Sequence, residues 1–315
     1  NYNVAVGDSA GGAVTTGIDN TLIGGLAGDA LTDADYNVAL GFHALSSDTK
    51  GSRATAIGQG ALFSQNFTTA TDNYNTAVGY AAGVNVTTGT ENTLIGGLAG
   101  DAQTTASYNT LIGSIAGSAL TTGGENTAVG RAALFAGTTG TQNVAIGVEA
   151  LSANTTGQFN VAVGYKALDT NIDGDGAVAI GYKALETLEP ADGQSYNVAV
   201  GYHAGKAMTT GTGNQIMGGL AGDALTTGSN NVAIGQEALS TEDTGGRNTA
   251  VGNATLSTLN YDGFGYNTAV GFNAGQSATT GTLNTLMGGL AGDAITTADE
   301  SVAIGYLALS ANTTA

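Results

Sequence analysis

The chain has 315 residues, including 52 Gly, a single Pro and no Cys, and it carries a formal net charge of −18. The lack of Cys excludes disulfides, thiolate catalysis and iron–sulfur clusters, and the single Pro excludes a collagen helix. The acidic balance would repel a nucleic-acid backbone, so no nucleic-acid partner is expected. No apolar run approaches the roughly 20 residues of a membrane span, so no membrane insertion is expected in this segment, which begins at Asn1 and is expected to belong to a longer protein.

One motif recurs along the whole chain, at a spacing of 17 residues in 14 of its 17 intervals. Position 1 is Asn in 15 of 18 copies, position 5 is always Gly, and positions 3 and 4 are always apolar. A unit this short cannot form a helix pair, and its apolar residues show no 3.6-residue recurrence. We predict one all-β domain over residues 1–315, a parallel β-solenoid of about 18 coils. The copies begin at Asn3, Asn20, Asn37, Ala54, Asn75, Asn92, Asn109, Asn126, Asn143, Asn160, Ala177, Asn197, Asn214, Asn231, Asn248, Asn267, Asn284 and Ser301.

The strict positions predict how successive coils join. The Gly at position 5 is expected to form a corner at positive φ or a close backbone approach, and the Asn at position 1 an amide ladder that caps free backbone groups. Positions 3 and 4 face opposite sides of a strand, so the strand is expected to be covered on both faces. The small Ala at position 3 suits packing against another copy of the chain, and a homotrimer is predicted, although periodicity alone also allows two subunits.

A longer pattern overlies the short one, because position 9 is Gly in nine copies and Leu in nine, arranged in blocks. Copies reading GGLAGDA exchange Ala for Leu or Ile at position 3 and a larger residue for Gly at position 6. We interpret this as a change of core shape rather than a ligand site. Seven copies also have Tyr or Phe directly before position 1, which predicts a packing role for Tyr2, Tyr36, Tyr74, Tyr108, Phe159, Tyr196 and Tyr266.

Three copies are lengthened, with insertions near residues 63–74, 186–196 and 257–266. Aromatic rings beside acids and amides stack on sugar rings and bind their hydroxyls, so these loops are the candidate receptor-binding sites. The alternative is that the aromatic side chains fold back to cover the solenoid or a subunit seam. The candidate residues are Phe63, Phe67, Tyr74, Glu189, Tyr196, Tyr261, Asp262 and Phe264.

The segment DTNIDGDG resembles the first half of a calcium loop, with Asp169, Asn171, Asp173 and Asp175 at alternating positions as candidate Ca²⁺ ligands. Ile180 stands where the bidentate Glu should be, so an ordinary acidic turn is the alternative. No other cofactor is expected.

Catalysis has little support in the sequence. His43 and His203 occupy position 7 of distant copies without a matched acid or nucleophile and are interpreted as surface substitutions, so no enzyme is predicted. Tyr165, Tyr182 and Tyr202 occupy position 6 of three consecutive copies and predict a stacked ladder.

Copies such as NTAVGYAAG (75–83), NVAIGQEAL (231–239) and SVAIGYLAL (301–309) resemble the repeats of YadA-like trimeric autotransporter adhesin heads and the NTAxGxxAL repeats of phage tail fibres. The resemblance implies a left-handed β-roll, a homotrimer on a bacterial surface or a virion tail fibre, and a cell-surface glycan or protein receptor. The coil is longer than in autotransporter heads, and no stalk or membrane anchor is present, so bacterial and phage origins both stay open.

These features predict a non-enzymatic, extracellular or virion-exposed trimeric fibre or adhesin that projects binding loops. A purely structural spacer or filament subunit is the alternative, in which the insertions are passive. An ice-binding solenoid ranks third, since the paired Thr residues fall in turns rather than along a flat strand.

Overall fold

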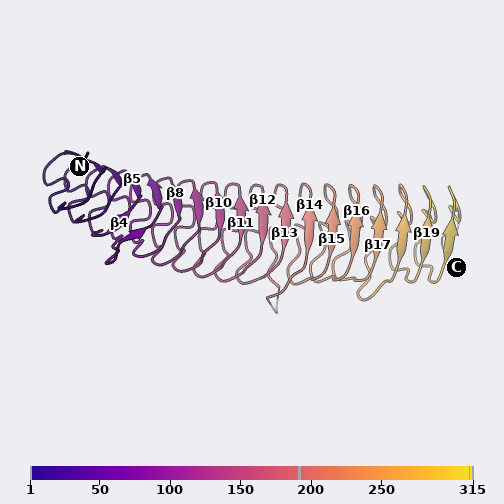
Figure 1. Ribbon diagram of the computed structural model, residues 1–315. Helices are drawn as coiled ribbons and strands as arrows, with labels where there is room; N and C mark the ends of the chain where they lie inside the picture. Colours follow the sequence, from indigo (N-terminus) through magenta and orange to yellow (C-terminus); the bar gives the residue numbers. More distant parts are fainter. Residues whose placement is uncertain (1, 191–192, 312, 314–315) are drawn as a thin grey trace. The chain divides into compact units, whose positions relative to one another are not determined.

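The computed structural model describes residues 2–190, 193–311 and 313. It divides into two compact units, residues 1–158 and 159–315. Each unit is a succession of coils that contribute one short strand apiece to a parallel sheet (Figure 1). The predicted all-β parallel solenoid with a repeat of about 17 residues is therefore confirmed, and the described residues contain no helix that could cross a membrane.

The first unit contains nine three-residue strands in its main sheet. The register advances by one repeat per strand, so that Leu94 lies beside Leu111 and Leu111 beside Ala128. A separate two-stranded sheet pairs β4, at the end of the third coil, with β6 of the lengthened fourth coil. The strands are β1 (Val4–Val6), β2 (Thr21–Ile23), β3 (Val38–Leu40), β4 (Gly51–Ser52), β5 (Thr55–Ile57), β6 (Thr71–Asp72), β7 (Thr76–Val78), β8 (Thr93–Ile95), β9 (Thr110–Ile112), β10 (Thr127–Val129) and β11 (Val144–Ile146).

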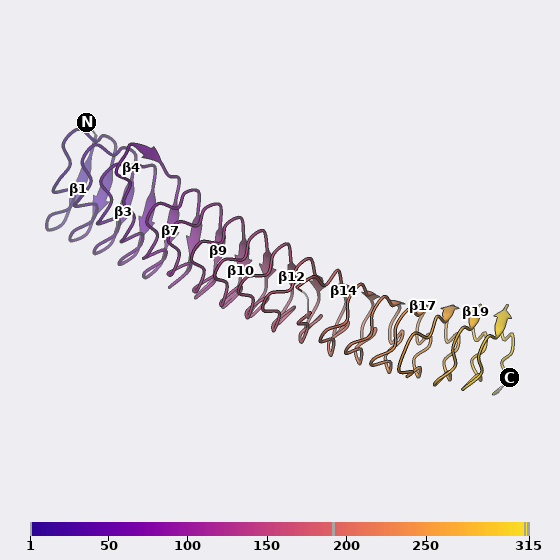
Figure 2. The same cartoon turned by 90° about the horizontal axis from the view of Figure 1, so that it is seen from below.

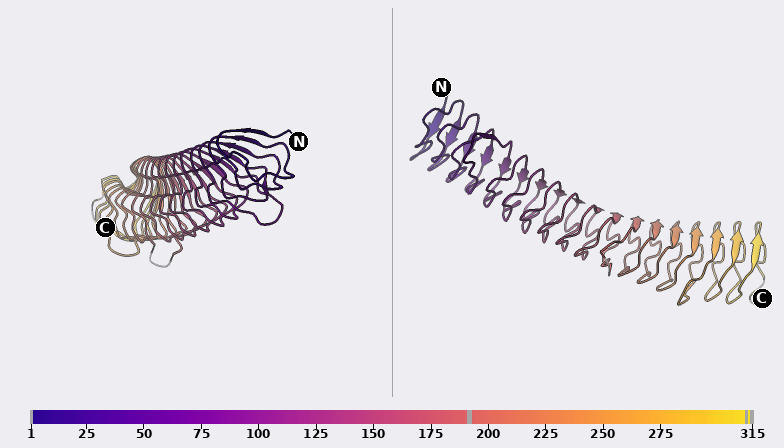
Figure 3. Two further views of the ribbon diagram at one scale, coloured as in Figure 1. Left: turned by 90° about the vertical axis from the view of Figure 1, so that its left-hand side faces the viewer. Right: turned by 60° about the horizontal axis from the view of Figure 1, so that its bottom comes forward.

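The second unit has the same construction, with nine strands in parallel register. Figure 3, right-hand view, shows these strands side by side along one edge of their coils, in orange and yellow, and Figure 2 shows the first unit's strands in indigo to magenta. The strands are β12 (Val161–Val163), β13 (Val178–Ile180), β14 (Val198–Val200), β15 (Gln215–Met217), β16 (Val232–Ile234), β17 (Thr249–Val251), β18 (Thr268–Val270), β19 (Thr285–Met287) and β20 (Val302–Ile304).

The invariant Gly at position 5 turns the chain at the end of each strand. All 18 of these glycines have φ between +122° and +145°, a region that only Gly occupies readily. A Cβ on Gly96 would lie 2.4 Å from the carbonyl oxygen of Gly113 in the next coil. Both reasons predicted for the glycine, the positive φ and the close backbone approach, are confirmed.

The predicted amide ladder is also confirmed. The side-chain oxygen of Asn109 accepts the backbone N–H of Asn126 in the next coil at 2.9 Å, and its Nδ2 donates to the carbonyl of Gly123 at 2.9 Å. The same two bonds recur at Asn20 and Asn214. These buried amides satisfy backbone groups that the short strands leave unpaired, which fixes the register between coils.

The core lies inside the coils and is lined by positions 3 and 8. Ala39, Ala128 and Leu111 at position 3 are fully buried, whereas Ile146 and Met217 at position 4 are 39% and 49% exposed. The prediction that the small Ala faces another copy of the chain is therefore wrong. Ala faces the interior because the narrow coil has no room there for larger side chains in most copies, and the larger aliphatic residues face outward.

The Gly and Leu types of coil fill one core space in two ways. Where position 9 is Leu, as at Leu45, the side chain enters the core and position 12 is usually small or polar. Where it is Gly, as at Gly28, position 12 supplies the apolar group in eight of nine coils, here Leu31, and a Cβ on Gly28 would lie 2.8 Å from it; the exception is Gln103. The predicted change of core shape is supported, but the apolar side chain is exchanged between positions 9 and 12. Position 6 lies on the surface, as at Gly97, where an added Cβ would meet nothing within 4 Å.

All nine Leu residues at position 9 have left-handed φ, between 49° and 56°. This conformation costs about 1–2 kcal/mol for a residue with a side chain. Burying a whole Leu side chain contributes roughly 1.5–3 kcal/mol, which offsets that cost. Burial in the core therefore allows a strained backbone that sequence preferences alone would assign to Gly or Asn.

Candidate functional site

The outward face of each sheet presents a row of aliphatic side chains. This row, at position 4, is aliphatic in every coil, with Ile23, Ile95 and Ile146 of the first unit 36–39% exposed. Met217 and Met287 of the second unit are 49% and 43% exposed. A continuous aliphatic stripe of this kind on a folded protein is typical of a surface that another molecule covers.

The first insertion places its three candidate aromatic residues differently. Phe67 is only 6% exposed and packs inside the lengthened coil, where its N–H donates to Asp48, so its prediction as a receptor-binding residue is wrong. Its side chain folds back because the insertion has its own small core. Phe63 and Tyr74 are 37% and 54% exposed and remain accessible.

Arg53 connects the exposed rings beside this insertion. Its guanidinium carbon lies 4.8 Å from the ring centre of Tyr36 and 5.8 Å from that of Tyr74, and its Nε pairs with Asp72 at 3.0 Å. Cation–π contacts at exposed sites contribute about 0.5–1 kcal/mol each. The aromatic residues before position 1 thus pack laterally on the surface rather than in the core, with exposures of 46–87% across the set.

Two insertions also repair the amide ladder. Position 1 is Ala in the coils that begin at Ala54 and Ala177, so the next coil loses its acceptor. The first insertion supplies Asn73, whose side-chain oxygen accepts the N–H of Asn75 at 2.9 Å. The second supplies Ser195, whose hydroxyl oxygen accepts the N–H of Asn197 at 3.2 Å. These insertions therefore have a structural role that the sequence analysis did not identify.

The second insertion presents Tyr196, 61% exposed, whose hydroxyl donates to Gln194 at 2.6 Å. Glu189 is half-buried and accepts the N–H of Ile172 at 2.6 Å. Burial and the adjacent Asp173 carboxylate raise the pKa of Glu189, while the bond from Ile172 opposes the shift. Residues 191–192 of this insertion lie outside the described residues.

The four candidate calcium ligands do not share one centre. Asp169 pairs with Lys166 at 3.1 Å. Asn171 is buried at position 12, where its Nδ2 donates to the carbonyl of Gly174 at 2.9 Å. Asp175 joins a backbone bridge to Gln194, and Asp173 lies beside the carboxylate of Glu189. Within the described residues no group of three or more His, Asp or Glu could hold a metal ion, and calcium binding stays a prediction.

The third insertion, which lies between β17 and β18, brings two exposed aromatic residues beside Arg247 (Figure 1 shows its backbone between the labels β17 and β19). Arg247 lies 3.9 Å from the ring centre of Phe264, which is 53% exposed, and it hydrogen-bonds the hydroxyl of Tyr266. Asp262 is exposed and accepts a bond from the Thr244 hydroxyl at 2.6 Å, whereas Tyr261 is half-buried. A cation, two rings and a carboxylate thus meet on one loop.

Glu242 lies fully buried beneath this loop. Its two oxygens accept the N–H groups of Gly245 at 2.8 Å and Tyr261 at 3.3 Å. Burial raises its pKa from 4.5 to about 7, although the two N–H donors oppose the shift. Between these values Glu242 holds its proton more in the folded chain than in the unfolded chain, so the contribution of this group to stability is greatest below pH 4.5 and is lost as the pH rises through about 7.

Replacing Glu242 with Gln should reduce this pH dependence. Gln65 and Gln103 occupy the same buried position in other coils, so Gln fits. The stability advantage of Glu242→Gln over wild type should grow between pH 4 and pH 8 by on the order of 2 kcal/mol, measured by chemical denaturation. Glu300→Gln removes an exposed carboxylate and is the control for net charge. An advantage that stays constant across this range would contradict the assignment.

The predicted tyrosine ladder is confirmed. The rings of Tyr165, Tyr182 and Tyr202 stack at 5.3 Å and 5.4 Å, with interplanar angles of 16° and 12°. His203 is not a simple surface substitution, because its ring stacks on Tyr202 at 4.0 Å and burial lowers its pKa. His43 likewise contacts Phe42 at 4.1 Å. Its Nδ1 also lies 3.2 Å from the Ser46 hydroxyl, a neighbour that the sequence analysis did not identify, and the absence of enzymatic activity stays a prediction.

The threonines at position 13 form a second structural ladder. The hydroxyls of Thr87, Thr104 and Thr121 each donate to the carbonyl of position 13 in the next coil, at 3.0, 3.3 and 2.9 Å. These hydroxyls are used within the protein and are not a free array for ordering water. This arrangement gives no support to an ice-binding surface.

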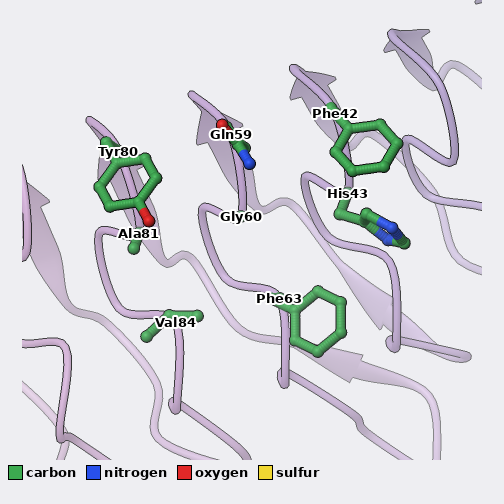
Figure 4. Close-up of a pocket in the computed structure, with 8 residues that line it drawn as sticks. All are labelled: Phe42, His43, Gln59, Gly60, Phe63, Tyr80, Ala81 and Val84. Carbon is green, nitrogen blue, oxygen red and sulfur yellow. The ribbon is translucent and has the colours of Figure 1, made fainter.

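Sequence reasoning also missed a hollow on the surface of the first unit. It has a volume of about 200 Å³ and lies beside Phe42, Phe63 and Tyr80 in three successive coils (Figure 4). A signal was available, because Gly60 is the single Gly at position 7 among the 18 copies and Phe63 is one of two Phe residues at position 10. Only the structure shows that these positions of neighbouring coils border one hollow.

Comparisons with protein-family models, with curated proteins and with solved structures found no significant match. The resemblance to adhesin heads and tail fibres therefore rests on the repeat motif alone. The surfaces suited to bind another molecule are the aliphatic sheet face, the aromatic groups of the insertions and the hollow beside Gly60.

Proposed function

We propose that this chain is a segment of a non-enzymatic, extracellular or virion-exposed fibre that assembles as a homotrimer and binds surfaces through side chains outside the trimer seam. The exposed aliphatic stripe at position 4 is the observation that carries the proposal. Position 4 is aliphatic in every coil, at one register and exposed or half-buried, so copies of the chain can cover it within each unit. The resemblance to adhesin heads and tail fibres favours three copies over two.

A second copy is the occupant that best matches this face. The stripe consists of Val, Ile, Leu and Met only, and its neighbours at position 2 are Val, Thr or Gln, so it offers no charge to an ionic partner. Obligate homo-oligomer interfaces have this apolar composition. Coil-by-coil pairing would also cover the stripe with side chains at the same spacing, which an unrelated globular partner would not provide.

Molar mass in solution tests the proposal. Wild-type protein should run as three chains of 30.8 kDa by light scattering. A variant with Ile180→Lys, Met217→Lys and Ile234→Lys places charges on the stripe and should run as a single chain with its solenoid intact by circular dichroism. Wild-type protein that is monomeric would overturn the proposal.

A matched control places the same charges elsewhere on the second unit. Thr210→Lys, Thr227→Lys and Thr280→Lys lie at the exposed position 14, where another coil has Lys50 naturally. This variant should keep the wild-type mass. Dissociation of both variants would indicate that net charge, rather than the stripe, controls assembly.

The spacer alternative is favoured by one observation, the use of Asn73 and Ser195 from two insertions in the amide ladder. The third insertion does not supply an acceptor to the amide ladder, because Asn248 is present and accepts the N–H of Asn267 at 3.2 Å. Its exposed Phe264, Tyr266 and Asp262 are therefore the insertion residues best suited to contact a receptor.

A further inference from the structure

The hollow beside Gly60 results from one missing side chain. Position 7 has a side chain in all the other coils, including His43 before the hollow and Ala81 after it. A Cβ on Gly60 would meet nothing within 4 Å, and its φ of +69° lies in the same left-handed region as the other coils. The gap is therefore open to solvent and does not serve the packing of the coils.

Three aromatic rings border the gap. Phe42, Phe63 and Tyr80 are 51%, 37% and 61% exposed, and Figure 4 shows them around Gly60. The His43 ring lies against Phe42 at 4.1 Å and Phe63 at 5.5 Å, both edge to face, and its Nδ1 lies 3.2 Å from the Ser46 hydroxyl. These contacts hold two of the walls in place before any ligand arrives, which lowers the entropy cost of binding.

Polar groups at the rim complete the lining. The Gln59 side-chain amide and the Tyr80 hydroxyl form no hydrogen bond with the part of the chain that the structure describes. An amide offers both a donor and an acceptor, and a phenol offers a hydroxyl that can do either. Aromatic walls with a few such groups suit a ring that has an apolar face and hydroxyls at its edge.

The size of the hollow and the charge around it indicate which class of ligand it can bind. A hollow of about 200 Å³ is smaller than the roughly 300–1,000 Å³ of sites for drug-sized ligands, so it fits a single ring. Among the described residues no Asp, Glu, Lys or Arg lines it, and the chain has a net charge of −18. An anionic sugar would be repelled by that charge without a local cation to compensate.

A related hollow lies further along the first unit. It has a volume of about 250 Å³ and lies beside Ile115, Ala132 and Phe135, where a small residue at position 7 again precedes Phe at position 10. Unlike the first hollow, it has a carboxylate in its lining, that of Glu149, which pairs with Arg131. These are the two copies of the chain with Phe at position 10. They are four coils apart, about 19 Å at the usual spacing of parallel strands, so one extended oligosaccharide could span both hollows.

We propose that the hollow formed by Phe42, Gln59, Gly60, Phe63 and Tyr80 binds one neutral hexopyranose ring of a glycan, with the hollow at Ala132 as a second subsite. The sugar's apolar face packs against the aromatic rings, and its hydroxyls bond Gln59 and Tyr80. The inference rests on the proposed surface-binding function and names its ligand class. It also assigns Gly60 the role of keeping the subsite open.

The test is to place a side chain in the hollow at residue 60. Leu occupies position 7 at φ +58° in other coils, as at Leu98 and Leu220, so Gly60→Leu should leave the fold intact. Ser9→Leu makes the same kind of change at exposed position 7 of another coil and is the control. Binding of neutral oligosaccharides of glucose, galactose and mannose, from two to six units long, is measured on a printed array and then by calorimetry with the full chain.

Wild type and Ser9→Leu should bind a common set of these oligosaccharides, and Gly60→Leu should bind them at least tenfold more weakly with unchanged molar mass. Equal binding by Gly60→Leu, or no binding of any of them by wild type, would overturn the inference. A change in molar mass of Gly60→Leu would assign the hollow to contact between chains and would also overturn it. A third variant lacking Tyr261–Phe264 separates the two proposals: if that deletion abolishes binding and Gly60→Leu does not, the third insertion is the receptor site and the hollow is not.

Discussion

Substituting Gly96 with Ala should destabilise the first unit by about 3–5 kcal/mol. At its φ of +136° a side chain costs roughly 1–3 kcal/mol, and the added Cβ would lie 2.4 Å from the carbonyl oxygen of Gly113. That oxygen belongs to the backbone of the next coil and cannot rotate away. The coils on either side would have to separate, so the effect should appear as a lower midpoint of chemical denaturation and faster amide exchange in β8 and β9.

The adjacent glycine is the matched control. Gly97 lies outside the left-handed region, and a Cβ there would meet nothing within 4 Å. Gly97→Ala should be neutral, or stabilising by up to about 1 kcal/mol because Ala restricts the unfolded chain. Similar losses for the two neighbours would show that the contact between the Gly96 and Gly113 backbones does not govern the join between coils.

Replacing Asn109 with Ala should cost about 2–4 kcal/mol. The substitution removes the acceptor for the N–H of Asn126 and the donor for the carbonyl of Gly123, each of which is a buried backbone group. A buried group left without a partner costs about 1–3 kcal/mol. Denaturation should therefore shift to lower denaturant concentration, and the Asn126 amide should exchange with solvent much faster than in wild type.

Asn85→Ala provides the comparison for the loss of an Asn side chain. Asn85 is exposed, and its Nδ2 donates to the carbonyl of Asp101 at 2.8 Å. Water can replace that bond, so the change should cost less than about 0.5 kcal/mol. If Asn109→Ala were equally mild, the amide ladder would be a consequence of coil stacking rather than one of its causes.

The joins between coils were predictable because each depends on one residue type with one physical property. Gly is the residue that tolerates φ near +140° beside another backbone, and Asn is small and has both a donor and an acceptor. A position occupied by Gly in every copy, or by Asn in nearly every copy, therefore indicates its own geometry. The orientation of the strand was not predictable in this way, because positions 3 and 4 are both apolar and alternation does not say which one faces inward.

The surface features were harder to predict, because they depend on contacts between side chains of different coils. Phe67 and Phe63 belong to one insertion, yet the first is buried against Asp48 and the second remains exposed. The Arg53 and Arg247 contacts with aromatic rings, and the replacement of the missing Asn by Asn73, join residues that the repeat alignment places in separate coils. The repeat alignment assigns each of these residues to a position in its coil, but it does not give the distances between side chains at different positions.

The uniform join between coils has an evolutionary consequence. Because Gly meets Gly at each step and Asn meets backbone in the same way at most steps, gaining or losing a whole regular repeat leaves the joins between the remaining coils unchanged. Recombination between misaligned gene segments would then produce shorter or longer descendants that still fold, provided that whole units are exchanged. The number of coils can thus vary under selection without redesign of the interior.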